Sequence, residues 1–310
     1  MSFLRAAIPS LALIVSAFAV GSTTATAATP TGFAFLEVPA GARAAAMGGA
    51  YVTLADGAEG AFWNPAGLAR VQGTQVTASH MESFQSLKHD QFAIAGEHFG
   101  GGLAASLRAM YSQAIDERDA LGNLLGTFGV HDLEFQLGYG RRVGGGGSIG
   151  LGVQAVRERI ADQSATTWSG SAGAAWRPRA WKNVRLGLSA QHLGPAAHYD
   201  FGGQQGAPVA LPAALQGGGS WTRQLAHGMG LTAALDARAT QGRQGVFALG
   251  GELASETGAS LRLGARQGDD LSNFGAGMGW KRGTFRVDYA WVPSKLDLGD
   301  THRFSFATQF

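Results

Sequence analysis

The chain has 310 residues, of which 15% are charged, and a formal net charge of +2. No cluster of Lys or Arg stands out, so the weakly basic balance gives no support to nucleic-acid binding. The absence of cysteine excludes disulfides and thiolate metal sites, and the 48 glycines show no collagen period and no low-complexity tract.

Residues 1–28 have the pattern of a secretory signal peptide. A short region containing Arg5 precedes an apolar core of 15 residues, and "ATA" at 25–27 is a small-residue cleavage site. The alternative is a retained membrane anchor. No later segment approaches the ~18 consecutive apolar residues of a membrane helix. An exported protein is therefore expected, either in the periplasm, outside the cell, or in the outer membrane as a barrel.

Residues 29–73 do not alternate cleanly between apolar and polar positions. The sequence "GARAAAMGGAYVTLADGAEGAFWNPAGLA" predicts a short helix at Ala42–Met47 and a small extended piece at Ala50–Leu54. A second helical turn follows, with Asp56 as its N-cap. Asn64 stands before Pro65, which forces an extended residue and then a turn.

From residue 74 onward the dominant period is two, which is the period of strands with one apolar and one polar face. In "DLEFQLGYG", for example, Leu133, Phe135 and Leu137 share a face opposite Glu134 and Gln136. All nine prolines fall outside the predicted strands, as expected for strands paired on both sides. The fourteen predicted strands are 74–80, 90–98, 101–112, 131–142, 147–160, 166–177, 182–192, 214–224, 228–239, 245–254, 259–267, 272–280, 284–292 and 301–310.

The connections between these strands alternate between two classes. Those after even-numbered strands are all short, whereas several of those after odd-numbered strands are long, above all 113–130 and 193–213. Up-and-down outer-membrane barrels combine tight periplasmic turns with longer outer loops in this way. A soluble sandwich with Greek-key crossings would not keep this alternation of short and long connections. The predicted fold class is therefore all-β, a transmembrane antiparallel barrel of about 14 strands.

Aromatic residues support the barrel interpretation. Trp168 and Trp176 share a face within one predicted strand and would lie ~26 Å apart along it, near the two rims of an apolar band. The alternative is a set of aromatics that cap a soluble core. The last residues, "HRFSFATQF", place Phe304, Phe306 and Phe310 on one face. They match a barrel's C-terminal insertion signal or an ordinary amphipathic last strand.

The motif at 41–69 resembles the N-terminal signature of the PorV/PorQ family of outer-membrane proteins. More distantly it is similar to the FadL-type long-chain fatty-acid transporters. The stretches "RLGLSAQHLGP" (185–195), "ALP" (210–212), "VDYAWVP" (287–293) and "LGDTHRFSF" (298–306) resemble that family as well. The resemblance implies a FadL-like fourteen-stranded barrel (74–310) with a small N-terminal hatch (29–73) in its lumen, which follows a signal peptide (1–28).

No catalytic, cofactor or metal site emerges from the sequence. "SGSAGA" at 169–174 lacks the glycine that a nucleophile elbow needs before its serine, and the eight histidines form no metal-ligand pattern. Mixed charges predicted to face inward are interpreted as a network that braces the hatch, with a substrate path as the alternative.

Two non-enzymatic functions follow from the resemblance. PorV/PorQ proteins act in type IX protein secretion, so the partners would be secretion-machinery proteins or secreted cargo besides outer-membrane lipid. Tyr199 and Phe201 would then be outer-loop contacts. The alternative is FadL-like passive transport of hydrophobic small molecules through a hatch-gated barrel. The candidate ligand-lining residues for that function are Met47, Phe62, Trp63, Asn64, Pro65 and Leu68.

Overall fold

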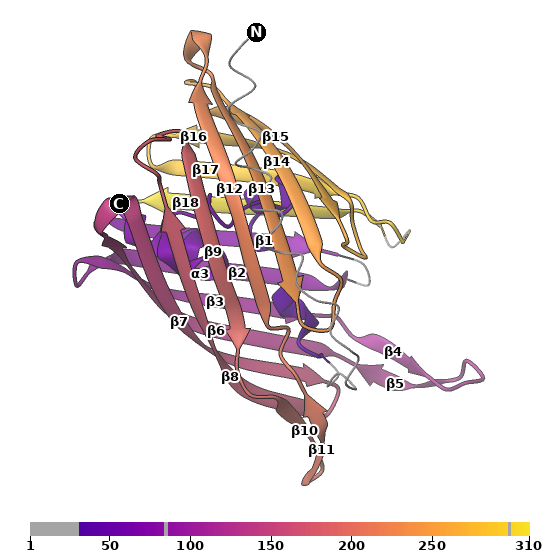
Figure 1. The fold of residues 1–310 in the computed structure, drawn as a ribbon. Helices are drawn as coiled ribbons and strands as arrows, with labels where there is room; N and C mark the ends of the chain where they lie inside the picture. The colour runs from indigo at the N-terminus through magenta and orange to yellow at the C-terminus, as the bar shows by residue number, and fades with distance from the viewer. Residues whose placement is uncertain (1–30, 84–85, 297–298) are drawn as a thin grey trace.

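A computed structural model describes residues 31–83, 86–296 and 299–310. The predicted signal peptide lies outside the described residues. One antiparallel sheet of 16 strands dominates the fold, and the pairing of β8 with β9 closes it into a barrel (Figure 1). β10 and β11 lie outside this ring, which leaves fourteen wall strands. These are β1 (Thr74–Glu82), β2 (Lys88–His98), β3 (Gly101–Tyr111), β6 (Val130–Val143), β7 (Gly147–Ile160), β8 (Gln163–Trp176), β9 (Val184–Leu193), β12 (Ala214–Gln224), β13 (Gly230–Thr240), β14 (Val246–Ala254), β15 (Ala259–Gln267), β16 (Phe274–Arg282), β17 (Phe285–Val292) and β18 (Thr301–Gln309).

The first wall strand begins, and the last one finishes, at the same end of the barrel. The backbone amides of Thr74 and Phe310 each donate to the other residue's carbonyl, at 3.1 and 2.8 Å. This short-turn end also carries the tight turns, two of which contain the 3-10 helices η5 (Gly144–Gly146) and η6 (Ala226–Gly228). The opposite end, which we call the long-connection end, carries the predicted long loops. The barrel prediction, with its fourteen strands and their alternating connections, is therefore confirmed.

Two hairpins at the long-connection end were not predicted from the sequence. β4 (Ile115–Arg118) pairs with β5 (Leu124–Phe128), and β10 (Ala197–Phe201) pairs with β11 (Gln204–Val209). Both hairpins project from the same end of the barrel (Figure 1). Pro208 lies within β11, where a missing N–H is tolerated because the strand is at the edge of the sheet.

The wall strands expose apolar side chains outward and bury polar side chains inward. Leu133, Phe135 and Leu137 are exposed on β6, whereas Glu134 and Gln136 are buried. Trp168 and Trp176 are both exposed on the outer face of β8, as their spacing predicts. This arrangement is the reverse of a soluble protein, in which the apolar face is the buried one.

The segment before the first wall strand, described here over residues 31–73, consists of short helices that lie within the ring of strands (Figure 1), and we refer to this segment as the hatch. Its helices are η1 (Ala34–Glu37), α2 (Ala42–Ala46), η2 (Gly57–Glu59), α3 (Gly60–Trp63) and η3 (Pro65–Arg70). The predicted helix at Ala42–Met47 is confirmed. The predicted extended piece at Ala50–Leu54 is wrong, because the amides of Leu54 and Ala55 both donate to the carbonyl of Tyr51 and so close a turn. Among the described residues, no helix combines the length and apolarity needed to cross a membrane.

Glycines in the wall let the hatch backbone touch the barrel directly. A Cβ on Gly250 would lie 2.6 Å from the carbonyl oxygen of Met47, and a Cβ on Gly264 would overlap the Gly48 amide. The glycine run at 217–219 has a different role. The space beside Gly218 is filled by the carboxylate of Asp236 from β13 and not by the hatch backbone.

Candidate functional site

Asn64 connects the hatch to the wall. Its side-chain oxygen accepts from the amide of Ala66 at 3.1 Å and so caps η3. Its side-chain amide donates to the carbonyls of Val52, at 3.1 Å, and of Ala174 on β8, at 3.2 Å. The residue is 1% exposed, so these bonds are not exchanged with water. One side chain therefore joins the end of α3 and the turn at residue 52 to the barrel wall.

A closed circuit of six charged side chains and one tyrosine holds the opposite side of the hatch. Arg43 of α2 donates two hydrogen bonds to Glu252 of β14, at 2.7 and 2.8 Å. Arg262 of β15 donates to Glu252 at 2.5 Å and to Asp288 of β17 at 2.8 Å. We call the whole set the charge ring; its members are Arg43, Glu252, Arg262, Asp288, Arg286, Glu59 and Tyr51.

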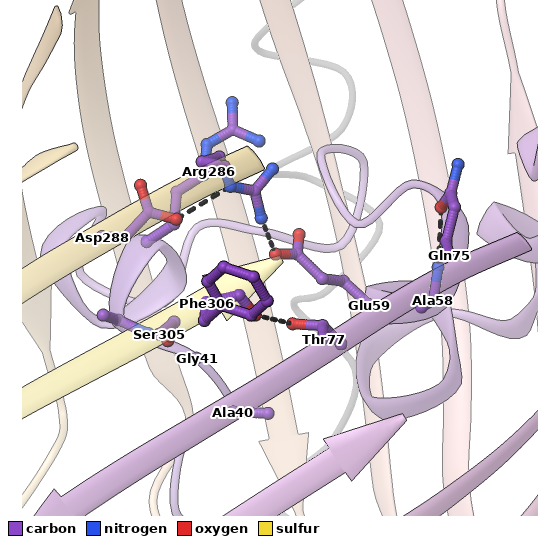
Figure 2. Close-up of polar contacts among 12 residues, drawn as sticks. Ala40, Gly41, Ala58, Glu59, Gln75, Thr77, Arg286, Asp288, Ser305 and Phe306 are labelled. Atoms are coloured by element: carbon purple, nitrogen blue, oxygen red, sulfur yellow. Dashed lines mark hydrogen bonds and ion pairs between the residues drawn. The ribbon is translucent and has the colours of Figure 1, made fainter. Parts of the chain in front are cut away.

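The remaining contacts of the charge ring return to the hatch. Figure 2 shows Arg286 between Asp288, at 2.8 Å, and Glu59 of η2. The phenol of Tyr51 donates to Glu59, and Arg43 donates to the Tyr51 oxygen at 3.3 Å. Burial raises the pKa of the Tyr51 phenol, so the group stays protonated and remains a donor. Opposite charges alternate around the circuit, which compensates the desolvation of its buried members.

Hydrogen bonds from many wall strands reach hatch backbone atoms. Asp236 of β13 accepts from the amides of Tyr51 and Val52, at 2.7 and 2.8 Å. Figure 2 also shows Gln75 of β1, which accepts from the amide of Ala58 at 3.2 Å. Further wall donors and acceptors are Gln91, Arg108, Arg142, Arg185, Gln191, Arg303 and Ser305. The inward polar residues therefore brace the hatch, as predicted.

A cavity of about 410 Å³ lies between the hatch and the long-connection end. Its wall includes residues of the connections 241–245, 268–273 and 293–300, and its hatch side is formed by Ala34, Glu37–Pro39, Gly48–Gly49 and Trp63. We call it the outer cavity. Apolar side chains such as Val38, Met81 and Val292 share its lining with several charged groups. Its size and mixed lining are those of a small-molecule site.

Trp63 lines both the outer cavity and a second, much smaller space of about 10 Å³. That space lies beside β1 and is also lined by Phe62, Thr77 and Ser79. The indole N–H of Trp63 donates to the carbonyl of Ala40 at 3.0 Å, and its ring packs edge-on against Tyr51 at 5.6 Å. Trp63 is thus held by two contacts within the hatch itself.

The six candidate ligand-lining residues occupy three kinds of position. Trp63 lines the outer cavity, and Phe62 lines the small space and stacks under Arg108. The other four are packed against the wall. Met47 contacts Gly250, Pro65 contacts Gly150, Leu68 contacts Gly138, and Asn64 bonds to β8.

The predicted loop and C-terminal residues lie on the surface or near it. Phe201 is exposed at the end of β10. Tyr199 instead donates its hydroxyl to Glu158 and packs against the buried cluster that includes Phe33 and Leu211; burial raises the pKa of its phenol. Phe304, Phe306 and Phe310 all point outward.

Sequence reasoning missed the hatch members of the charge ring. Arg43, Asp56 and Glu59 are the three charged residues of the otherwise small, apolar or uncharged motif at 41–69, and their scarcity was the available signal. The wall partners of Arg43 and Glu59 are about 200 residues away along the chain, since Arg43 and Glu252 are separated by 209 positions. In the described part of the chain, no three His, Asp or Glu side chains gather as a metal site.

Comparison with known proteins gives a family. The model of "Uncharacterised protein family (UPF0164)" matches residues 10–164, which is half of the chain. The chain belongs to the UPF0164 family. No curated protein matches this UPF0164 chain.

Solved structures share the fold of this UPF0164 protein. The Ralstonia pickettii toluene transporter TbuX is 14% identical, with a TM-score of 0.61 over 87% of this chain and 98% of its own. The Pseudomonas putida toluene transporter TodX is 11% identical, with a TM-score of 0.58 over 86% and 96%. A FadL homologue from Pseudomonas aeruginosa is 12% identical, with a TM-score of 0.51 over 86% and 97%. The UPF0164 protein therefore has a FadL-like barrel.

Proposed function

We propose that this UPF0164 protein is an outer-membrane barrel that admits hydrophobic small molecules passively through its outer cavity. In this proposal residues 1–28 are a signal peptide, 29–73 a hatch and 74–310 the barrel. An apolar outer face has no favourable place in water, whereas lipid satisfies it, and closure pairs the strand edges. Two neighbours of the same fold are described as toluene transporters, and no catalytic group is proposed.

The observation that carries the proposal is the position of Trp63, which lines both the outer cavity and the small space beside β1. Val38, Pro39 and Trp63 are among the hatch residues that line the outer cavity at the long-connection end. The charge ring and Asn64 hold the hatch on opposite sides, so a local displacement of Trp63 would leave those contacts in place. We infer that Trp63 is the gate.

The test is uptake of a labelled small apolar compound by cells that carry the protein in an intact outer membrane. Trp63→Ala removes the indole that lines both spaces, so uptake should rise severalfold. The matched control is Trp221→Ala, which removes an indole from the outer face and should leave uptake unchanged. A heat-dependent gel shift checks that each variant is folded. Uptake by Trp63→Ala at or below the wild-type rate would contradict the gate.

A second candidate function, supported by the two projecting hairpins, is PorV/PorQ-like action in protein export. The β10–β11 hairpin presents Phe201, whose side chain is 52% exposed, and the β4–β5 hairpin presents Leu121, Leu124 and Leu125. Exposed apolar side chains on projecting hairpins are suited to partner contacts. Deleting residues 196–208 would remove the β10–β11 hairpin. If co-purifying partners and secretion are unchanged in that variant, this role is wrong.

A further inference from the structure

Two buried carboxyl groups face each other on the inner side of the barrel wall. Asp132 of β6 and Glu158 of β7 are directly opposite in the antiparallel register, a position in which Cβ atoms lie ~4.5–5.5 Å apart. They are only 3% and 6% exposed. Like charges directly opposite each other are destabilising, and burial adds to the cost of each charge. The pair is therefore more stable when one proton is retained.

The side chains beside the pair supply no positive charge. In the same row across the sheet, Asp132 is followed by Met110 of β3, and Glu158 is followed by Ala165 of β8. Both of these neighbours are uncharged. Among the described residues, neither Asp132 nor Glu158 forms an ion pair, and no arginine or lysine acts on either carboxyl group.

The charged groups of the same two strands are engaged elsewhere or face away. Glu134, two residues from the pair on the inner face of β6, is bonded to Arg108 at 3.3 Å and lies 3.5 Å from His192. Arg157 and Arg159 alternate with the inward residues of β7 and are exposed on the outer face. The negative charge of the pair is therefore uncompensated.

Glu158 also connects the β10–β11 hairpin and the start of the hatch to the wall. The phenol of Tyr199 in β10 donates to its carboxylate. A Cβ on Gly32 would lie 3.5 Å from its Oε1, so the first described residues of the hatch lie against the same group. Tyr199 and Ala197 of the hairpin pack with Phe33 in one apolar cluster. The carboxyl pair therefore lies beneath the contact between hairpin and hatch.

This end of β6 and β7 extends beyond the apolar outer face, because its outward residues His131, Arg157 and Arg159 are polar and exposed. Burial and the carboxylate of Glu158 raise the pKa of Asp132 well above its usual range. Water that enters when the hairpin leaves would return this pKa to its ordinary value. The docked state is thus favoured while the proton is bound, and it loses stability as the pH rises above the ordinary carboxyl range.

We propose that Asp132, Glu158 and Tyr199 form a proton-controlled latch, in which a shared proton keeps the β10–β11 hairpin docked and its loss releases the hairpin. Phe33 directly precedes η1, and η1 residues line the outer cavity, so release also loosens one side of that cavity. The inference goes beyond the proposed function, because the latch acts on the hairpin whatever passes through the barrel.

Hydrogen exchange of residues 197–209 tests the latch in the purified full-length barrel, in a non-ionic detergent at pH 5 and pH 8. Opening that releases one proton becomes up to about tenfold more favourable per pH unit. After correction for the intrinsic pH dependence of amide exchange, the hairpin should exchange about tenfold or more faster at pH 8. Glu158→Gln keeps an acceptor for Tyr199 and removes the like charge, so exchange should stay slow at both pH values. Asp132→Asn should have the same effect.

His198→Gln is the matched control, because histidines change charge between pH 5 and pH 8 and His198 lies exposed in the same hairpin. This variant should keep the wild-type pH dependence, and a heat-dependent gel shift checks that each variant is folded. Three results would overturn the latch: hairpin exchange within twofold at the two pH values in the wild type, pH dependence that persists in both carboxyl variants, or pH dependence that is lost in His198→Gln.

Discussion

The charge ring should control how firmly the hatch is held. Glu252→Gln keeps the size of the side chain but leaves Arg43 and Arg262 facing each other without their shared carboxylate. Loss of one partner from a buried ion pair costs ~3–5 kcal/mol. We expect the lower end of this range, because the Arg43 side chain is 20% exposed. The free energy of opening the hatch should therefore fall by about 3 kcal/mol.

Hydrogen exchange of hatch peptides measures this opening free energy directly. A loss of about 3 kcal/mol corresponds to roughly a hundredfold faster exchange at residues 40–60, since each 1.4 kcal/mol is a factor of ten. Asp116→Asn is the matched control. It breaks the Arg118–Asp116 pair, whose side chains are both 53% exposed, and should cost less than about 1 kcal/mol. Exchange at 40–60 within twofold of wild type in a folded Glu252→Gln barrel would refute the reasoning.

Three further variants test other parts of the account. Asn64→Ala should lower hatch stability by about 2–4 kcal/mol, because it removes a cap and leaves the carbonyl of Val52 without its donor; unchanged exchange at residues 60–70 would contradict this. Gly264→Ala should lower thermal stability by about 1–3 kcal/mol through overlap with Gly48. Gly251→Ala should not, because its Cβ would lie 4.0 Å from the carbonyl oxygen of Leu263, an ordinary contact. Phe310→Ala should reduce the amount of heat-shiftable barrel in the outer membrane if the C-terminal aromatics are an insertion signal, and an unchanged amount would exclude Phe310 from that role.

The wall strands could be predicted because their two faces meet different surroundings. Leu133 and Phe135 point outward while Glu134 and Gln136 point into the lumen, so the chemistry alternates with the period of the strand. The hairpins β4–β5 and β10–β11 carry no such contrast, since residues on both of their faces are exposed. Their strands are also short, and β11 contains a glycine and a proline.

The candidate site could be predicted only in part. Asn64-Pro65 predicted a turn, because turn chemistry is local, whereas the hatch was expected from the family resemblance of the motif at 41–69. The pairing of Arg43 with Glu252, or of Glu59 with Arg286, depends on contacts between positions more than 200 residues apart. The wall residues of the outer cavity belong to separate strands, and only the closure of the barrel brings them around one space.

The most direct test of the central claim is a crystal structure of the barrel with a brominated apolar ligand such as bromodecanol. The account predicts an anomalous bromine peak inside the outer cavity, against Val38, Trp63 or Met81. Bromine peaks confined to the outer, lipid-facing surface of the barrel would contradict a small-molecule path through this cavity.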